Sequence, residues 1–400
     1  MNMLKFIRLF FYLVISVAIV SCSEDDPRPQ RDRLVSATSV LSRDASELRT
    51  FISVSGIDID ASLLQYDVEI FKIEYKTDYL DEEVMASGLV ILPKTTDPVG
   101  MLSFQHGTIA AHRQAPTKLA INSTELILYS ALAAPGFIGV VPDFLGFGSS
   151  EGILHPYYVE ELTASAVVDM LKAAKELAIE EGNKFNTKLF LAGYSQGGYA
   201  TMAAHKAIET NGLEGFELIA SFPASGGYDI KGVQEYFFSL TEYDQPFFLA
   251  YVAFAYQTTL DWSQPLSDFF KAPYADLIPG LFDGSKSGSE INEQLTTTIA
   301  DLVTDDLRAN IDTDSKYNYI VTAFNDNSLL DWVPQANMYM YHGTADVTVP
   351  YSTSIDTYDY FIAQGASTNT VTFTPLNGAT HNTGVIPYVE DFVKKLGALK

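Results

Sequence analysis

A serine in the segment Gly193-Tyr194-Ser195-Gln196-Gly197 has the surroundings of a catalytic nucleophile. The segment follows an apolar run typical of a strand, residues 189–192, and begins a helical stretch of small residues, 198–207. A sharp turn from strand to helix strains the serine and needs small neighbours, which Gly193 and Gly197 supply. The bare G-x-S-x-G pattern also occurs in structural turns, so the prediction that Ser195 is a nucleophile depends on this context.

A serine hydroxyl reacts only when a base takes its proton and an acid orients that base. Asp346 follows a strand-like run at 338–341, and His381, the only histidine after Asp346, follows a second extended run at 370–375. Both residues are therefore expected on loops at the C-terminal edge of the sheet. Open α/β sheets bind ligands at this edge, which also carries Ser195.

A further loop, Gln105-His106-Gly107-Thr108, follows the strand-like run at 101–104. The position suits an oxyanion hole made by the N–H groups of Gly107, Thr108 and Gln196, with a simple glycine turn as the alternative. Structural roles are predicted for the other histidines: loop positions for His112 and His155, a helix for His205 and a hydrogen-bonding strand end for His342.

A calcium site is the one metal site that the sequence suggests. Asp312-Thr313-Asp314 resembles the start of a calcium loop, but Lys316 occupies the fifth position and Ala323 the twelfth. Since that loop needs an oxygen ligand at both positions, these residues predict a solvated acidic loop. We expect no metal and no cofactor.

The elements that would position these residues form an α/β pattern. Two extended runs, 68–75 and 84–93, predict antiparallel edge strands. Apolar residues at helical spacing from Val159 to Leu177 predict a helix that ends at Gly182. Short apolar runs separated by helices predict a mostly parallel sheet buried on both faces, at 101–104, 137–141, 189–192, 218–222 and 338–341.

More than a hundred residues separate the runs at 218–222 and 338–341, which is too long for an ordinary crossover. An insertion at about 228–332 is predicted. Its segment 236–282 holds 14 aromatic residues in 47, against 12% for the chain, so it must bury or present a large aromatic surface. We expect most of these rings in the core of the insertion and the rest on a pocket wall.

The N-terminus has the features of an export signal. Lys5 and Arg8 precede an apolar run, and residues 1–21 are predicted to be a lipoprotein signal peptide that is removed by cleavage. Cys22, the only cysteine, follows directly, at the position where a lipoprotein is acylated. An ordinary cleaved signal that leaves a free thiol is the alternative. Residues 22–45 are predicted to be a flexible tether, and Ser23-Glu24-Asp25-Asp26 resembles a signal for the outer face of the outer membrane.

The composition restricts the partners. A net charge of −25 argues against nucleic acid, because phosphate contacts need Lys and Arg. A chain with one cysteine forms no internal disulfide, so the fold depends on its apolar core.

Several of these motifs together resemble the α/β-hydrolase superfamily, and within it the secretory lipase and related esterase family, over about residues 68–396. The motifs are the Gly193–Gly198 elbow, the Gln105–Thr108 turn, Pro142-Asp143-Phe144-Leu145-Gly146-Phe147-Gly148 with His155-Pro156-Tyr157, His342-Gly343-Thr344-Ala345-Asp346 with Val349-Pro350, and His381.

The resemblance implies an α/β-hydrolase domain at 46–400, with helices on both faces of the sheet and the insertion as a helical cap. It also implies Ser195 as nucleophile, His381 as base and Asp346 as acid. The chain lacks the disulfides that family lipases often carry.

The expected activity is hydrolysis of carboxylic esters, with lipid, glycan or other small esters as substrates, through an acyl-enzyme and without a cofactor. A peptidase or amidase of the same fold is an alternative, and a non-catalytic binding protein on the same scaffold is another. The expected location is the bacterial outer membrane, with its outer face at the cell surface as the narrower alternative, through lipid on Cys22.

Overall fold

The computed structural model describes residues 31–400. The predicted signal peptide, Cys22 and residues 22–30 of the predicted tether lie outside the described residues. Within residues 31–400, no helix is both long and apolar enough to cross a bilayer.

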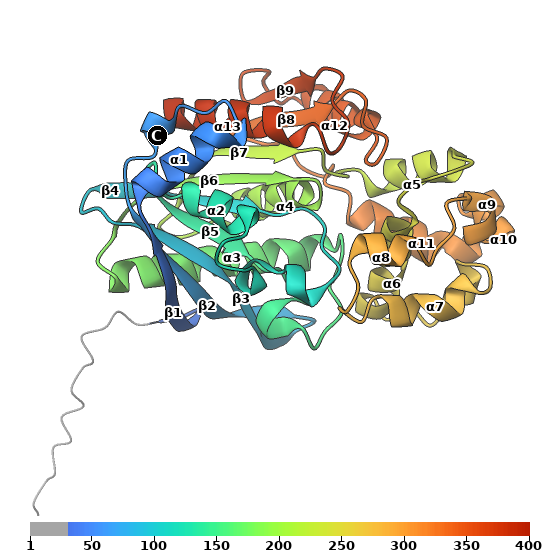
Figure 1. Cartoon of the computed structure of the whole chain (residues 1–400). Helices are drawn as coiled ribbons and strands as arrows, with labels where there is room; N and C mark the ends of the chain where they lie inside the picture. The colour runs from blue at the N-terminus through green and yellow to red at the C-terminus, as the bar shows by residue number, and fades with distance from the viewer. Residues whose placement is uncertain (1–30) are drawn as a thin grey trace, which may run out of the picture.

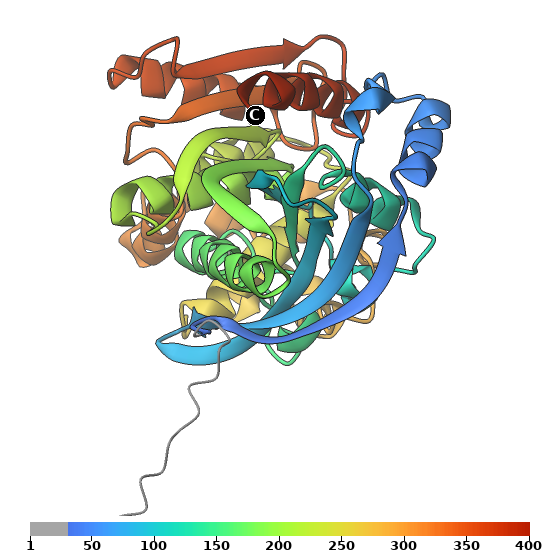
Figure 2. The same cartoon turned by 90° about the vertical axis from the view of Figure 1, so that its left-hand side faces the viewer.

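The described chain contains one nine-stranded sheet in the order β1-β2-β3-β5-β4-β6-β7-β8-β9 (Figures 1 and 2). The first three strands and β5 pair antiparallel, whereas β5, β4 and β6 to β9 pair parallel. The predicted mostly parallel sheet is therefore confirmed. The strands are β1 Leu34–Arg43, β2 Val68–Tyr79, β3 Glu82–Pro93, β4 Pro98–Gln105, β5 Phe137–Pro142, β6 Lys184–Tyr194, β7 Glu217–Ala224, β8 Asn337–Gly343 and β9 Val371–Leu376.

Helices cover both faces of the sheet, which explains why the central strands are almost entirely apolar. On one face lie α3 (Glu160–Glu180), α4 (Gln196–Asn211) and α12 (Tyr351–Ala363), and on the other lie α1 (Ala45–Ser55), α2 (Thr124–Ala131) and α13 (Val385–Leu399). The predicted helix over Val159 to Leu177 is α3, and Gly182 follows it in the left-handed conformation with φ 85°.

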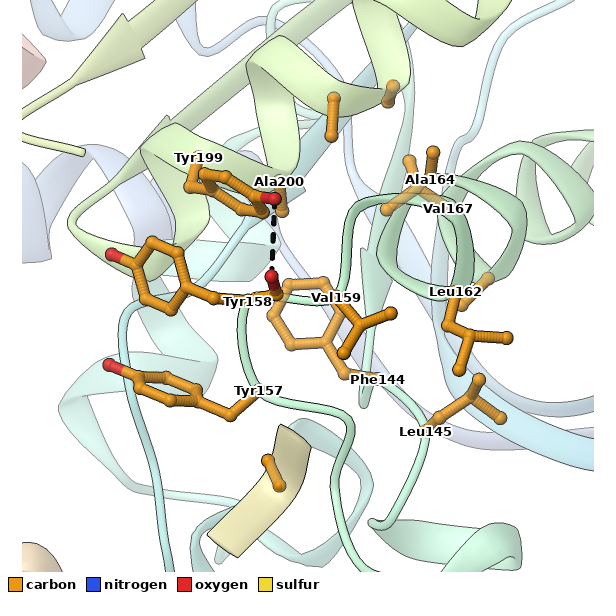
Figure 3. Close-up of a cluster of buried hydrophobic side chains, with 14 of the residues drawn as sticks. Phe144, Leu145, Tyr157, Tyr158, Val159, Leu162, Ala164, Val167, Tyr199 and Ala200 are labelled. Carbon is orange, nitrogen blue, oxygen red and sulfur yellow. Dashed lines mark hydrogen bonds between the residues drawn. The ribbon is translucent and has the colours of Figure 1, made fainter. Parts of the chain in front are cut away.

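A cluster of buried rings joins α4 to the loop before α3 (Figure 3). The hydroxyl of Tyr199, in the first turn of α4, donates to the carbonyl of Asn327 at 2.7 Å and lies 3.3 Å from that of Tyr158. These bonds fix the start of α4, the helix that follows Ser195, against the end of the insertion.

The predicted flexible tether is wrong from residue 34 onward, and β2 is not at the edge. Residues 34–43 form β1, which pairs with β2 and is the edge strand. The error has a physical cause: an edge strand with exposed side chains is held mainly by backbone hydrogen bonds, so its sequence is polar. The carboxylate of Glu176 on α3 fixes the strand's start by accepting the N–H of Asp32 at 2.9 Å and of Leu34 at 2.7 Å.

Residues between β7 and β8 form a separate group of helices at the C-terminal end of the strands (Figure 1). The two ends of this segment lie side by side, since the N–H of Leu329 donates to the carbonyl of Tyr228 at 2.8 Å. The helices are α5 Ile230–Ser239, α6 Pro246–Thr259, α7 Tyr274–Leu281, α8 Gly288–Asn292, α9 Ile299–Leu302, α10 Asp305–Asn310 and α11 Asn318–Asp326.

Candidate active site

Ser195 occupies a strained turn between β6 and α4, with φ 61° and ψ −125°. Such a conformation is costly for a residue with a side chain, and its surroundings must maintain it. The Ser195 N–H donates to the carbonyl of Ala224 on β7 at 2.9 Å. A methyl group on Gly197 would lie 1.9 Å from the carbonyl oxygen of Gln105, so the tight packing of β4 against α4 requires glycine there.

The structure brings the three predicted residues together in one chain of hydrogen bonds. His381 Nε2 lies 2.9 Å from Ser195 Oγ, and His381 Nδ1 lies 2.7 Å from Asp346 Oδ2. Because an ionised carboxylate only accepts, His381 carries its proton on Nδ1 and presents the lone pair of Nε2 to the serine hydroxyl. This tautomer is the one that a general base for Ser195 requires.

Asp346 is held by donors on both of its oxygens. Oδ1 accepts the N–H groups of Thr348 at 2.9 Å and Val349 at 3.0 Å, and His342 Nε2 lies 3.2 Å from Oδ2. Burial by itself would raise the pKa of Asp346, but the hydrogen bonds from His342 and His381 outweigh it and lower the pKa to about 2. The carboxylate is therefore ionised at neutral pH.

The loop that carries His381 is fastened to its neighbours. The hydroxyl of Tyr194, the residue before Ser195, donates to the carbonyl of His381 at 2.7 Å. The loop after β8 donates to it twice, from Thr344 N–H to Leu376 at 3.1 Å and from Ala345 N–H to Ala379 at 3.0 Å. The positions of His381 and Asp346 are therefore linked.

Of the predicted oxyanion residues, Gly107 and Gln196 lie beside Ser195. A methyl group on Gly107 would lie 3.6 Å from the Cβ of Ser195, and Thr108 Oγ1 lies 2.9 Å from the hydroxyl of Tyr157. Gln196 is the first residue of α4, so its N–H has no partner within the helix and lies at the positive end of the helix dipole.

His155 holds the side chain of Gln196. His155 Nδ1 lies 2.6 Å from the carbonyl of Leu145 and must carry the proton, so Nε2 accepts from the amide of Gln196 at 2.6 Å. Burial lowers the pKa of His155 to about 3, which keeps the ring neutral and able to accept. The sequence predicted only a loop position for His155, because no local pattern shows its contact with a residue 41 positions later.

An apolar cavity of about 110 Å³ runs from Ser195 into the insertion. Half of the 14 aromatic residues in 236–282 line it, so the rings are divided between the insertion's core and the pocket wall as predicted, with a larger share on the wall than expected. The aromatic wall residues from this segment are Phe237, Phe238, Tyr243, Phe248, Trp262, Phe269 and Phe270.

The carboxylates of the acidic loop at Asp312 have their partners within the protein. Asp312 pairs with Lys231 at 2.9 Å, and Asp314 accepts the N–H of Lys316 at 3.0 Å. Across residues 31–400, no group of three or more His, Cys, Asp or Glu side chains is arranged to hold a metal ion.

Comparisons with known proteins agree with the fold. The secretory lipase family model matches residues 112–212, and no curated protein gives a significant match. A putative hydrolase from Legionella pneumophila is 27% identical with a TM-score of 0.82, covering 92% of this chain and 98% of its own.

Two further solved structures are more distant. The rice cell wall degrading esterase LipA from Xanthomonas oryzae is 23% identical with a TM-score of 0.77, covering 93% of this chain and 97% of its own. Candida antarctica lipase A in its closed state is 15% identical with a TM-score of 0.66, covering 91% of this chain and 81% of its own.

The chain thus has the α/β-hydrolase fold. The predicted resemblance to the secretory lipases and related esterases is confirmed, and it is carried by the segment from His112 to Gly212, which contains the Ser195 elbow.

Proposed function

We propose that this protein hydrolyses carboxylic esters, with Ser195 as nucleophile, His381 as general base and Asp346 as the acid that orients it. The observation that carries the proposal is the unbroken hydrogen-bond chain from Ser195 Oγ through His381 to Asp346, beside an apolar cavity. The resemblance to lipases and esterases supports the same reaction.

Acylation begins when Ser195 Oγ attacks the ester carbonyl and His381 Nε2 takes the hydroxyl proton. The imidazolium that forms is stabilised by Asp346 through the Nδ1–H bond. Negative charge on the carbonyl oxygen is stabilised by the N–H groups of Gln196, Gly107 and Thr108. The tetrahedral intermediate then collapses, and His381 gives its proton to the departing alcohol.

Deacylation repeats these steps with water. His381 takes a proton from the water, the hydroxide attacks the acyl-enzyme carbonyl, and the proton returns to Ser195 Oγ as the carboxylic acid leaves. Both steps use only groups of this chain, the ester and water.

The insertion acts as a cap that binds the acyl group. Tyr157, Phe248 and Val252 bring an almost wholly apolar wall to Ser195, with few groups that would pair with a polar acyl chain. Each well-buried aliphatic or aromatic contact stabilises the bound acyl group by roughly 1 to 3 kcal/mol. The cavity thus favours aliphatic acyl esters over acetyl esters.

Lipid attached to Cys22 would anchor the enzyme to the bacterial outer membrane. The proposal depends on the basic, apolar and small-residue pattern of residues 1–22 and on the absence of a second cysteine.

The enzymatic proposal is tested by labelling with a fluorophosphonate, which reacts with activated serines. We expect labelling of the native protein and none of Ser195→Ala. Matched p-nitrophenyl esters and p-nitroanilides distinguish an esterase from an amidase, and a panel of acetyl, aliphatic, feruloyl and sugar esters identifies the acyl group. Absence of both labelling and hydrolysis in the folded native protein would favour the non-catalytic binding protein.

A further inference from the structure

We propose that His342 is a positioning residue that holds the Asp346 carboxylate in place and sets the pH range in which the Asp346–His381 pair works. The proposal rests on the proposed function, in which Asp346 orients the base. His342 lies four residues before Asp346 at the end of β8 and is fully buried.

The hydrogen bonds of His342 fix its tautomer. Nε2 faces two acceptors, Asp346 Oδ2 at 3.2 Å and the carbonyl of Val349 at 2.9 Å. Neither acceptor has a proton to give, so Nε2 carries the hydrogen and Nδ1 is the acceptor of the neutral ring. The hydroxyl of Ser354 on α12 lies 2.6 Å from Nδ1 and completes the arrangement as donor.

As a result, two imidazole N–H groups share one carboxylate oxygen. His381 donates to Asp346 Oδ2, and the N–H of His342, divided between the Val349 carbonyl and this same oxygen, approaches it with Nε2 at 3.2 Å, while two backbone N–H groups occupy Oδ1. A carboxylate with donors on both oxygens cannot rotate without breaking several bonds. His342 therefore acts on Ser195 only through Asp346 and His381.

The other titratable groups around this pair are phenols. Tyr351 packs its ring edge against His342 with centroids 5.9 Å apart, and burial, with a smaller contribution from the charge of Asp346, raises the pKa of Tyr194 and Tyr243. Tyr194 and Tyr243 therefore stay neutral at the pH where the pair works, so the histidines are the groups that balance the charge of Asp346.

The N–H of His342 draws electron density from Oδ2 and makes that oxygen a weaker base. Without it, Asp346 would take a proton more readily and would also stabilise the imidazolium form of His381 more strongly. Through both effects, the Asp346–His381 pair would take up its proton at a higher pH than in the native protein. Removing the donor should therefore raise the pH at which activity is lost on the acid side.

The test compares kcat/KM from pH 4 to 9 for three variants on one p-nitrophenyl ester. For His342→Leu, which has no donor, we expect the acidic limb of the pH profile, where kcat/KM falls as pH decreases, to move up by about one pH unit. We also expect kcat to fall about ten-fold. His342→Gln places an amide N–H near the position of Nε2 and should keep the native limb. Ser354→Ala, which leaves the ring in place without its anchor, should shift the limb in the same direction as His342→Leu by a smaller but measurable amount.

His205→Leu is the matched control, because His205 is equally buried and bonded to Ser221 but does not touch Asp346. Equal losses of kcat in His342→Leu and His342→Gln, with the acidic limb unmoved in both, would show a merely structural role and overturn the proposal. If His342→Leu does not fold, a native acidic limb in Ser354→Ala overturns it as well.

A readout independent of catalysis separates this proposal from the proposed function. The lowered pKa of Asp346 stabilises the fold at pH values above the unfolded pKa, and this stability is lost as pH falls toward about 2. In His342→Leu the pKa of Asp346 moves back toward its unfolded value, so thermal unfolding between about pH 2 and 6 should show a smaller loss of stability that is complete at a higher pH. If the native protein hydrolysed no ester but His342→Leu still changed the pH dependence of unfolding in this way, the proposed esterase function would be refuted and the role of His342 toward Asp346 would stand.

Discussion

Asp346→Asn tests the tautomer of His381, because the substitution keeps the shape of the side chain and changes one acceptor into a donor. The carboxamide has two ways to sit. In the native protein Oδ1 accepts two backbone N–H groups, from Thr348 and Val349, and a backbone N–H can only donate. The amide oxygen must remain on that side, so the NH2 group faces the histidines.

An NH2 group in that position requires an acceptor at His381 Nδ1, which now donates at 2.7 Å. His381 then carries its proton on Nε2, the nitrogen 2.9 Å from Ser195 Oγ, and cannot take the serine proton. Loss of a correctly held base costs on the order of 10⁴ in kcat. The oxyanion N–H groups and the cavity remain, so KM should change little.

The assay is p-nitrophenyl ester hydrolysis, with protein concentration corrected by unfolding curves. Asp331→Asn is the matched control, since Asp331 is an exposed aspartate that pairs with Lys206 away from Ser195. A folded Asp346→Asn variant with kcat within ten-fold of native would refute the tautomer argument and the assignment of Asp346.

Three further outcomes follow from particular contacts. Gly197→Ala should lower the free energy of unfolding by about 1–3 kcal/mol or more, because its methyl group would lie 1.9 Å from the Gln105 carbonyl oxygen. Gly152 has open space around it, so Gly152→Ala should leave the free energy of unfolding unchanged. Equal unfolding midpoints for the two variants would contradict this prediction. Trp262 lines both the apolar cavity and a neighbouring surface cleft of about 640 Å³, so its removal should open the cavity into the cleft and make room for a long acyl chain. Trp262→Ala should therefore raise the ratio of dodecanoate to acetate hydrolysis rates about ten-fold. Tyr274 lines neither space, so Tyr274→Ala should leave the ratio unchanged. Cys22→Ala should move the protein from the membrane pellet to the supernatant, and a variant that still pellets would exclude lipid on Cys22 as the anchor.

The sequence predicted the parts of the fold in which local pattern and burial coincide. The apolar runs that became β4 to β8 are covered on both faces, so their composition alone marks them. The order of Ser195, Asp346 and His381, each after a strand, was enough to predict that they meet at one edge. Strand β1 could not be predicted in this way, because its pairing with β2 leaves a polar and half-exposed sequence.

Supporting residues were the hardest part of the site to predict. His342 was predicted to be a hydrogen-bonding strand end, and its bonds to Ser354 and Val349 confirm that reading. Its contact with Asp346 depends on a loop turning back by four residues, which spacing does not reveal. His155 reaches Gln196 only because the chain before α3 folds over the start of α4.

The backbone of Thr348 couples the insertion to Asp346. Its N–H donates to Asp346 Oδ1 at 2.9 Å, while its carbonyl accepts the hydroxyl of Tyr243, from the insertion, at 2.8 Å. The insertion is also bound near the elbow, since Tyr251 stacks on Tyr157 with centroids 4.4 Å apart. A movement of the insertion that widened the cavity would therefore have to break the Tyr243 bond or pull on the loop that holds Asp346. Because of this coupling, changes that loosen the cap near Tyr243 should affect kcat, whereas changes deeper in the cavity, as at Trp262, should affect acyl preference.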